Sequence, residues 1–308
     1  MNFIKYAYGD FLKNLAIFKN VTTLEPKKAT VKVKWCLSGI RETVTPIPAG
    51  SRVTANYDVY FETTEYQEIP IGTQEIIILM TCTVPGVEGN GFAPGELTIV
   101  VDPIGFIDSV ENIETSSGGS GEESDQSLAE RTYLAPSSYS TAGPDDAYIY
   151  WAKNYDPLVG DVFPDSPTPG VVDIRFILTD GSIPDEAMIE GMEKHLQQRG
   201  KRPLTDHVVV SAPDVVPYSI KLKYFINSSD TANAASIQKQ AIQAVEEYKI
   251  WQCAKIGRDI NPDELRAFLK KAGVKRIELT EPAFNVLDKK EIAVCSGQEI
   301  LYGGLEDD

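Results

Sequence analysis

The chain has 308 residues, of which 42% are hydrophobic and 24% charged, so it is an ordinary globular sequence with room for two or three domains. Its formal net charge of −16, from 29 basic and 45 acidic residues, argues against nucleic acid as a main partner, because binding to a phosphate backbone needs a basic surface. No apolar run approaches the roughly 20 residues of a transmembrane helix, so we expect no membrane insertion.

Residues 1–28 are predicted to form a helical lead-in. In FIKYAYGDFLKNLAIF (3–18) apolar residues recur at roughly helical spacing, although Gly9 weakens the pattern. The segment contains Asp10 and scattered lysines and lacks a small-residue cleavage site, so it is not typical of a signal peptide.

Residues 29–114 are predicted to form a small antiparallel β domain. In TVKVKW the side chains alternate by two, which places Val31, Val33 and Trp35 on one face of a strand. Further strands are expected between proline- and glycine-rich turns, at 57–64, 75–84 and 98–101.

Residues 115–165 are predicted to form a glycine-rich joint followed by a helical segment. TSSGGSGEES (115–124) cannot bury enough apolar surface to hold one conformation, so we expect a mobile connection. A phosphate loop is disfavoured, because no Lys-Ser or Lys-Thr follows and Glu122-Glu123 would repel phosphate. Two short helices are predicted after the joint, at 124–134 and 144–155.

Residues 166–228 are predicted to form an α+β domain. A strand at 170–178 leads to a helix with Ser182 as its N-cap and Asp185 as the capping-box acid, and Gly200 ends that helix. Two more strands, at 207–213 and 218–226, complete the domain.

Residues 229–308 are predicted to form a C-terminal helix-strand domain that is a possible dimerisation unit. A long helix carries apolar residues on one side, and Asn261-Pro262-Asp263-Glu264 starts a second helix. Strands at 274–279 and 291–295 follow, and the polar tail is expected to fray. The fold class is therefore α+β and multidomain: a β domain, a helical segment, a sandwich-like middle domain and a helix-strand domain.

The corner GKRPLTDHVVV (200–210) is the place where a helix must stop and a strand begin, because Pro203 cannot continue a helix. Adjacent residues of an extended chain point to opposite faces, so Asp206 and His207 cannot easily form an acid-base dyad. We expect Arg202 to bind a carboxylate or the carbonyls at the helix C-terminus, and Asp206 to bond its own turn backbone. The candidate structural corner comprises Arg202, Pro203, Leu204, Thr205 and Asp206.

No constellation typical of an enzyme is present. GxSxG, HExxH and GxGxxG after a strand are all missing. His195 lies on a predicted helix near its apolar stripe and is expected to be a partly buried packing residue. The four cysteines are scattered without a CxxC pair and are predicted to be reduced thiols. The paired acids, including Glu122-Glu123 and Asp145-Asp146, lie in segments that look solvated. We therefore predict no catalytic residue, no cofactor and no metal site.

Motifs along nearly the whole chain resemble the baseplate J-like family, the wedge proteins of contractile phage tails and related contractile injection systems. The strongest is PGVVDIRFILTDGSIPDE (169–186) joined to GKRPLTDHVVVSAP (200–213), in which Arg202 to Asp206 reproduce a family hallmark. The others, in chain order, are YAYGDFLKNLA (6–16), IPAGSRV (47–53) with YFETTE (60–65), NIETSSGGSGEESDQSLAER (112–131), AYIYWAKNYDPLVGDV (147–162), IGRDINPDEL (256–265) and GVKRIEL (273–279).

The resemblance implies a structural protein of a virion or phage-tail-like particle that assembles in the bacterial cytoplasm. Its partners would be other baseplate wedge proteins and copies of itself, in a sixfold ring that encloses the tail tube and changes shape when the sheath contracts. Phage, bacteriocin and host-encoded injection systems all stay open. Family members usually carry tens of residues of helix before the YAYG-like segment, which here begins at Tyr6, so this member is expected to lack that region. Lys13 stands where an aspartate is usual.

Two sets of aromatic residues are candidates for contacts with partners. The candidate interface comprises Tyr148, Tyr150 and Trp151 in the helical pair 124–158, and Tyr248 and Trp251 in the C-terminal unit. An alternative function is a carbohydrate- or receptor-binding module on the β domain. Its sugar-stacking residues would be Tyr57, Tyr60, Phe61 and Tyr66, although alternating aromatics are ordinary in strands.

Overall fold

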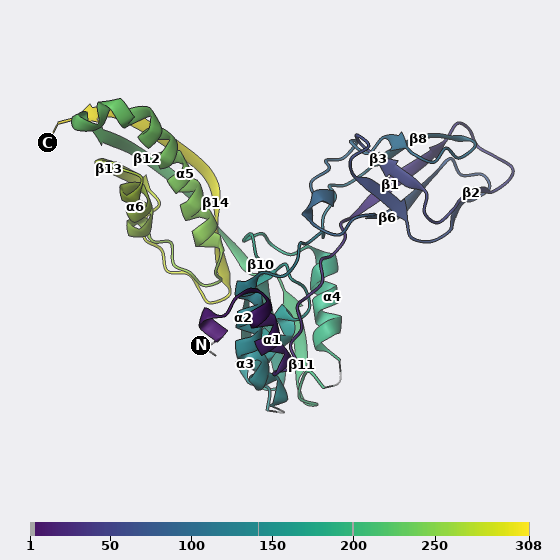
Figure 1. Ribbon diagram of the computed structural model, residues 1–308, viewed down its shortest axis with the longest axis horizontal. Helices are drawn as coiled ribbons and strands as arrows, with labels where there is room; N and C mark the ends of the chain where they lie inside the picture. Colours follow the sequence, from purple (N-terminus) through teal and green to yellow (C-terminus); the bar gives the residue numbers. More distant parts are fainter. Residues whose placement is uncertain (1–3, 141, 199, 308) are drawn as a thin grey trace. The chain divides into compact units, whose positions relative to one another are not determined.

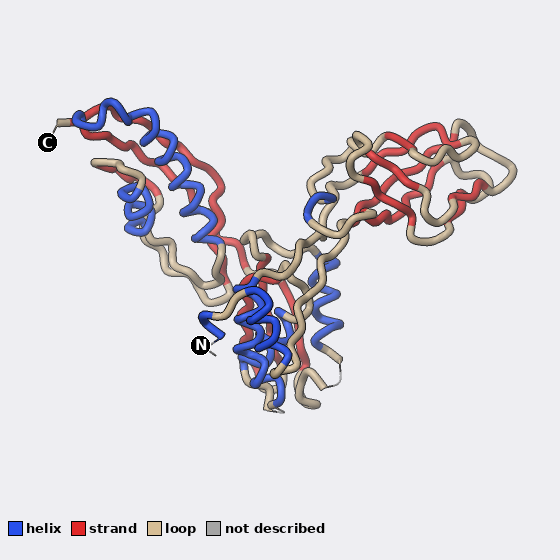
Figure 2. The backbone as a smooth tube through the Cα atoms, in the orientation of Figure 1, coloured by secondary structure: helices blue, strands red, loops and turns tan. Residues whose placement is uncertain are grey.

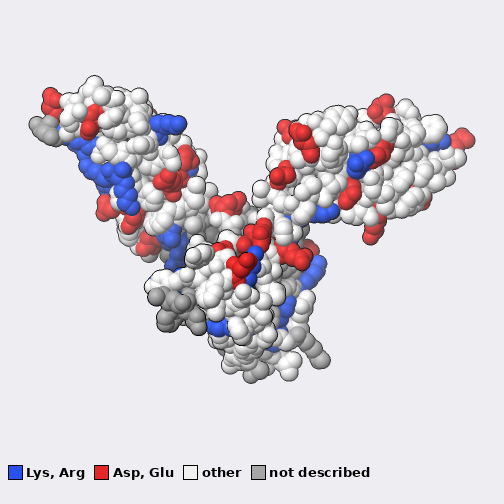
Figure 3. All heavy atoms as spheres, viewed as in Figure 1, with Lys and Arg blue, Asp and Glu red and all other residues white. Residues whose placement is uncertain are grey.

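The computed structural model describes residues 4–140, 142–198 and 200–307, which form two compact units that divide between Thr132 and Tyr133. Helices and sheets occur together in the chain, and an antiparallel β domain comes first (Figure 1). The predicted α+β multidomain class is confirmed. Acidic and basic side chains are interspersed over the visible face of each unit (Figure 3).

The β domain of the first unit is a six-stranded sheet in the order β7-β3-β4-β6-β1-β8, in which every neighbouring pair is antiparallel. Long loops join its strands (Figure 2). Val31, Val33 and Trp35 are fully buried on one face of β1, as the alternation predicted. The strands are β1 (Thr30–Leu37), β3 (Arg52–Thr54), β4 (Tyr60–Thr63), β6 (Glu75–Cys82), β7 (Ile99–Val100) and β8 (Ile107–Asn112), with a small sheet of β2 (Thr45–Ile47) and β5 (Gln67–Ile69) and a 3-10 turn η2 (Val87–Gly89).

The N-terminal helix predicted over 3–18 is two pieces, a 3-10 turn η1 (Ile4–Tyr6) and α1 (Gly9–Ile17); Phe3 lies outside the described residues. Gly9 has φ +57°, a left-handed conformation that only glycine adopts at low cost, and the helix starts anew there. Its backbone N–H donates to Asp125 Oδ2 at 2.8 Å, at the start of α2 (Asp125–Leu134). The carboxylate therefore stabilises the N-terminus of α1.

The glycine-rich segment 115–124 is hydrogen-bonded to the β domain, which argues against the predicted mobile joint. Isolated β-bridges pair Ser117 with Thr30 and Ser120 with Lys27, and the side-chain amide of Asn90 both donates to and accepts from the backbone of Gly119. A Cβ at Gly119 would lie 2.3 Å from the carbonyl oxygen of Gly86. At this position glycine allows two backbone segments to pack closely. A glycine-rich composition is the same for a closely packed segment and for a mobile one, so the sequence alone could not distinguish them.

The second unit begins with a central domain built on a three-stranded sheet in the order β11-β10-β9. The strand β10 (Val171–Leu178) pairs antiparallel with β9 (Val159–Thr168) and parallel with β11 (His207–Ser211), and α4 (Glu186–Leu196) makes the crossover. The N-cap of α4 is Asp185, whose carboxylate accepts from the Met188 N–H, and not Ser182. Ser182 instead bonds the Asp180 side chain within the preceding turn.

Two shorter elements precede this sheet. They are η3 (Ala135–Tyr139) and α3 (Asp145–Lys153). Tyr148 and Ala152 of α3 share one hydrophobic cluster with Met192 and Leu196 of α4 and with Phe176 of β10. The central domain therefore includes residues that we had assigned to the helical segment 115–165.

The C-terminal domain is a sheet in the order β13-β12-β14, with α5 (Ala234–Cys253) and α6 (Pro262–Lys271) packed on one face (Figure 1). Asn261 caps α6, as predicted, by accepting from the Asp263 N–H. The other elements are β12 (Asp214–Asn227), a 3-10 turn η4 (Ser228–Asn233), β13 (Arg276–Glu281) and β14 (Glu291–Glu306).

Two predictions about this domain are corrected. The strand predicted at 218–226 is part of β12, which pairs with β13 and β14, so it belongs here and not to the α+β domain 166–228. Residues 303–306 of the tail GGLEDD, which was predicted to fray, are the end of β14, and Glu306 accepts two hydrogen bonds from Arg276 of β13. The parallel pairing with β12 and this ion pair stabilise a segment that has the composition of a loop. Asp308 lies outside the described residues.

Candidate functional site

The corner between α4 and β11 is organised by Arg202. Its Nη1 donates to the carbonyl oxygens of Asp206 at 2.6 Å and of Pro203 at 3.0 Å, and lies 3.4 Å from that of Leu204. The predicted partners, a carboxylate or the carbonyls at the end of the helix, are wrong: the guanidinium closes the turn that follows it. This geometry fixes the direction in which the chain enters β11.

Asp206 connects the corner to α3. Its Oδ2 accepts a hydrogen bond of 2.6 Å from the Tyr148 hydroxyl, and its Oδ1 lies 3.2 Å from Thr205 Oγ1. Burial and the adjacent Asp206 carboxylate raise the pKa of Tyr148, so the phenol stays protonated and donates. The prediction that Asp206 bonds its own turn backbone through its side chain is therefore corrected. A pocket of about 220 Å³ borders this contact and includes Gly143, Asp145 and Asp165 in its lining.

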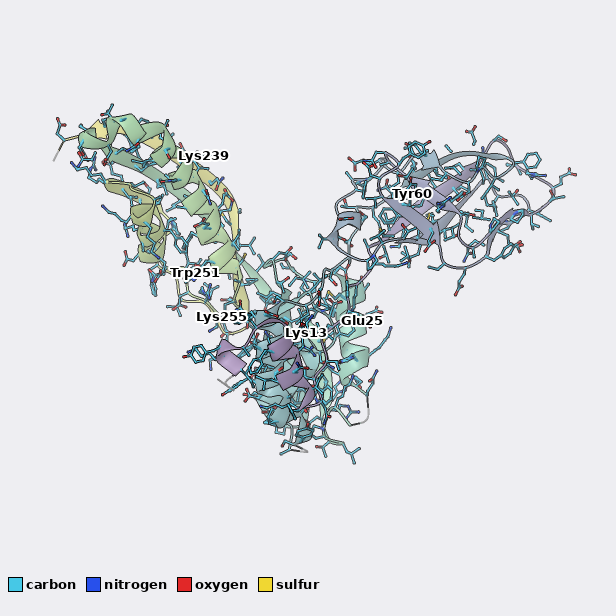
Figure 4. All side chains as sticks on the ribbon, in the orientation of Figure 1. Lys13, Glu25, Tyr60, Lys239, Trp251 and Lys255 are labelled. Atoms are coloured by element: carbon cyan, nitrogen blue, oxygen red, sulfur yellow. The ribbon has the colours of Figure 1, made fainter. Side chains whose placement is uncertain are left out.

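Three of the five candidate interface residues are buried inside the chain. Tyr148, Tyr150 and Tyr248 are between 0% and 6% exposed, so we correct their assignment to a surface. Trp151 and Trp251 are half-buried; Trp251 lies toward the C-terminal end of α5 and stacks on Tyr248 with ring centroids 5.9 Å apart (Figure 4). An interface at these two tryptophans stays a prediction.

The aromatic residues of the alternative function do not share one face. Phe61 is fully buried and meets Phe92 edge to face at 5.8 Å, whereas Tyr57 and Tyr66 are more than half exposed. Tyr60 lies in the β domain (Figure 4), and its hydroxyl donates a hydrogen bond to the Tyr57 carbonyl. Phe61 therefore belongs to the core and is not available for sugar stacking, whereas a carbohydrate site at the three tyrosines stays a prediction.

The histidines and cysteines take ordinary structural positions. His195 is half-buried, lies 5.2 Å from the Tyr155 ring and contacts the Trp151 carbonyl, which is the packing role predicted for it. Burial raises the pKa of the Cys253 thiol and so disfavours a reactive thiolate. Across residues 4–140, 142–198 and 200–307, no group of three or more potential ligands could hold a metal ion, and no helix is long and apolar enough to cross a membrane.

A buried ion pair that the sequence analysis missed ties the two chain segments that enter and leave the β domain. Glu123 and Arg131 have side chains that are 0% and 1% exposed, and two hydrogen bonds of 2.7 Å join them. The guanidinium also donates to the Thr22 carbonyl, and Glu123 accepts from the Leu24 N–H. The assignment of Glu123 to a solvated segment is wrong.

A second ionic cluster joins the central and C-terminal domains within the second unit. Lys290 Nζ lies 2.8 Å from Asp165 and 3.0 Å from Asp173, and Arg175 donates to Asp173. Hydrogen bonds from Lys290 lower the pKa of Asp165. For Asp173, burial alone would raise the pKa, but hydrogen bonds from Arg175 and Lys290 outweigh it and lower the pKa.

An apolar cluster accompanies these ions. It joins Ile177 of the central sheet to Ile256 and Ile292 of the C-terminal domain. The backbone N–H of Ile256 also donates to the Asp161 carboxylate at 3.0 Å. Charged and apolar contacts together therefore fasten one domain to the other.

These features define a multidomain α+β protein with separate hydrophobic cores and with ion pairs at the connections between its domains. Three family models match the sequence in order, namely the Baseplate J-like protein barrel domain over residues 36–119, the Baseplate J-like central domain over 140–212 and the Baseplate J-like protein C-terminal domain over 218–300. The chain belongs to the baseplate J-like family, and the resemblance stated above is confirmed. It is a structural component of a baseplate.

Among the solved structures that are similar to this chain is one from the cryo-EM structure of the anti-feeding prophage (AFP) baseplate, 6-fold symmetrised. The two are 13% identical, with a TM-score of 0.42, over 88% of this chain and 77% of that chain. No curated protein matches the sequence.

Proposed function

We propose that this chain is a wedge subunit of the baseplate, present in several copies in a ring around the tail tube of a contractile phage tail or a phage-tail-like particle. The observation that carries the proposal is the order of the three family domains, which together span residues 36–300. Other wedge proteins and copies of the same chain would be its partners, and assembly would take place in the bacterial cytoplasm.

The connections between domains suit a subunit that has to transmit force. Force applied to the β domain passes through two chain segments, and the Glu123–Arg131 pair and the bridges at Lys27 and Thr30 bind those segments to each other. The Lys290 cluster does the same between the central and C-terminal domains. The division into two compact units supplies a boundary at which the subunit can change shape during contraction without unfolding a core.

Particles purified from cells that carry the gene test the proposal. Quantitative mass spectrometry with isotope-labelled peptides should find this chain in a multiple of six copies per particle, as a sixfold ring requires. Deletion of the gene should leave tubes or sheaths that lack baseplates, and the intact gene supplied separately should restore them. A copy number that is not a multiple of six, or complete particles from the deletion strain, would refute the ring.

A further inference from the structure

One end of the β domain carries three loops, residues 38–44, 70–74 and 102–106, that backbone contacts bring together. The Gly72 N–H donates to the Arg41 carbonyl at 3.1 Å, and the Ser38 N–H donates to the Phe106 carbonyl at 3.1 Å. Ile40, Arg41, Ile71 and Phe106 therefore lie on one surface, which we call the loop-end surface.

The loop-end surface exposes three large apolar side chains. Ile40 is 69% exposed, Ile71 61% and Phe106 60%. Single exposed apolar residues are ordinary on a protein surface, but several gathered at one place mark interaction sites.

Phe106 is held in a conformation that costs energy without burying its ring. Its φ of +73° lies in the left-handed region, which is unfavourable for a bulky residue. Instead of entering the core, the ring stacks against Arg41, with the guanidinium carbon 3.5 Å from the ring centroid. Backbone strain of this kind is found mainly at functional sites, where the strained residue takes part in binding or catalysis.

Arg41 is placed to receive a carboxylate. Within residues 4–132 its side chain makes neither an ion pair nor a hydrogen bond, whereas Lys32, Lys34 and Arg52 of the same domain are each paired with an acid. The Phe106 ring covers one face of the guanidinium and leaves its N–H edge for a planar acceptor. Arginine and aromatic residues are enriched among the residues that contribute most to binding at protein interfaces.

We propose that the loop-end surface is a docking site for another baseplate subunit that presents a carboxylate flanked by apolar side chains. The carboxylate would pair with Arg41, and the apolar groups would cover Ile40, Ile71 and Phe106. A second copy of this chain is disfavoured, because two chains of net charge −16 repel each other. The inference rests on the proposed function, since it requires the chain to sit in a particle.

Photo-crosslinking in assembled particles tests the docking site. Strains would make the chain with p-benzoylphenylalanine in place of Ile40 or Ile71, and in place of Ile77, which is 53% exposed on β6, as the matched control. After irradiation, mass spectrometry should join positions 40 and 71 to one different subunit, next to an aspartate or glutamate, and should not join position 77 there. Crosslinks to a second copy, equal crosslinks from position 77, or none from 40 and 71 in particles that contain the chain would overturn the inference.

A charge exchange gives a second, independent readout. Arg41→Glu should lower incorporation into particles at least about tenfold, and changing the crosslinked acid of the partner to arginine should restore it. The melting temperature of purified Arg41→Glu should equal that of wild type, which separates lost docking from lost folding. Absence of the wild-type chain from all particles would refute the proposed function and with it the docking site; its presence without these effects would refute the docking site alone.

Discussion

Glu123 and Arg131 meet as a fully buried, two-hydrogen-bond ion pair at the root of the β domain. A buried ion pair as a whole contributes only modestly to the free energy of unfolding. Removal of one partner is costly, because it leaves an uncompensated charge in a low-dielectric site. Arg131→Met should therefore lower the free energy of unfolding by about 3–5 kcal/mol. The double variant Glu123→Leu with Arg131→Met should lose less, because no charge is left behind.

Urea denaturation followed by circular dichroism measures these differences. The matched control is Glu122→Gln, which removes the exposed pair with Lys13 one residue away and should leave the unfolding midpoint unchanged. If Arg131→Met costs no more than this control, the pair does not hold the root of the β domain.

The hydrogen-bonded segment 115–124 should resist proteases in the free protein. Its bridges to Lys27 and Thr30 occupy the backbone that a protease must extract. Gly119→Ala should abolish this protection, because the added methyl meets the Gly86 carbonyl, whereas Gly121→Ala, with nothing within 4 Å of the added carbon, should keep it. Limited proteolysis with mass-spectrometric mapping checks both. If the protease cleaves the wild type first within 115–124, the prediction of a mobile joint is supported instead.

The corner at Arg202 should be required for stability and not for contacts with partners. Arg202→Ala frees three turn carbonyls and should cost about 1–2 kcal/mol. Tyr148→Phe removes one hydrogen bond to a carboxylate and should cost about 1.5–3 kcal/mol. Both should lower the melting temperature in thermal scans while particles still incorporate the chain. A variant as stable as wild type that fails to assemble would place the corner in an interface.

The junction between the central and C-terminal domains should weaken in acid. Asp165 and Asp173 have lowered pKa values in the folded protein. Their contribution to stability is therefore complete above the ordinary carboxyl pKa of about 4, and it is lost as the pH falls through their pKa values in the folded state. Lys290 has a raised pKa through its hydrogen bonds with Asp165 and Asp173, so its contribution lasts until strongly alkaline pH. The ionic cluster is thus intact between about pH 5 and pH 9.

Melting temperatures between pH 3 and pH 7 check this dependence. Lys290→Met should flatten the acid branch, since the two carboxyls lose the partner that lowers their pKa values. Lys194→Met, which removes an exposed pair with Glu190, should keep the wild-type profile. Equal slopes for wild type and Lys290→Met would show that the ionic cluster does not link pH to stability.

Local sequence signals predicted local structure well. The alternation at Val31, Val33 and Trp35 and the cap at Asn261 each depend on neighbours in the chain, and the structure has both. Non-local pairing is what the pattern could not reveal. Residues 303–306 have the composition of a polar tail, and only the ladder between β14 and β12 shows that they form a strand. The strand β12 likewise could not be assigned to a domain without its partners. Glu123 looked solvated because its acidic neighbour Glu122 is solvated, and only the fold brings Arg131 to it.

The isolated chain should associate weakly and through the C-terminal domain. β14 is at the edge of its sheet, and its outer part exposes Leu301 and Leu305, at 51% and 43%. An open strand edge is a template for pairing, but the net charge of −16 opposes the approach of a second copy until salt screens it, over about 10 Å at 0.1 M. Sedimentation velocity over a salt series should show monomers that form weak dimers as the salt concentration rises. Leu305→Glu should weaken these dimers, while Ile250→Glu on the exposed side of α5 should not. A dimer that dissociates as the salt concentration rises would contradict the role of charge repulsion. A stable sixfold ring formed by this chain alone would show that ring assembly does not require other wedge proteins.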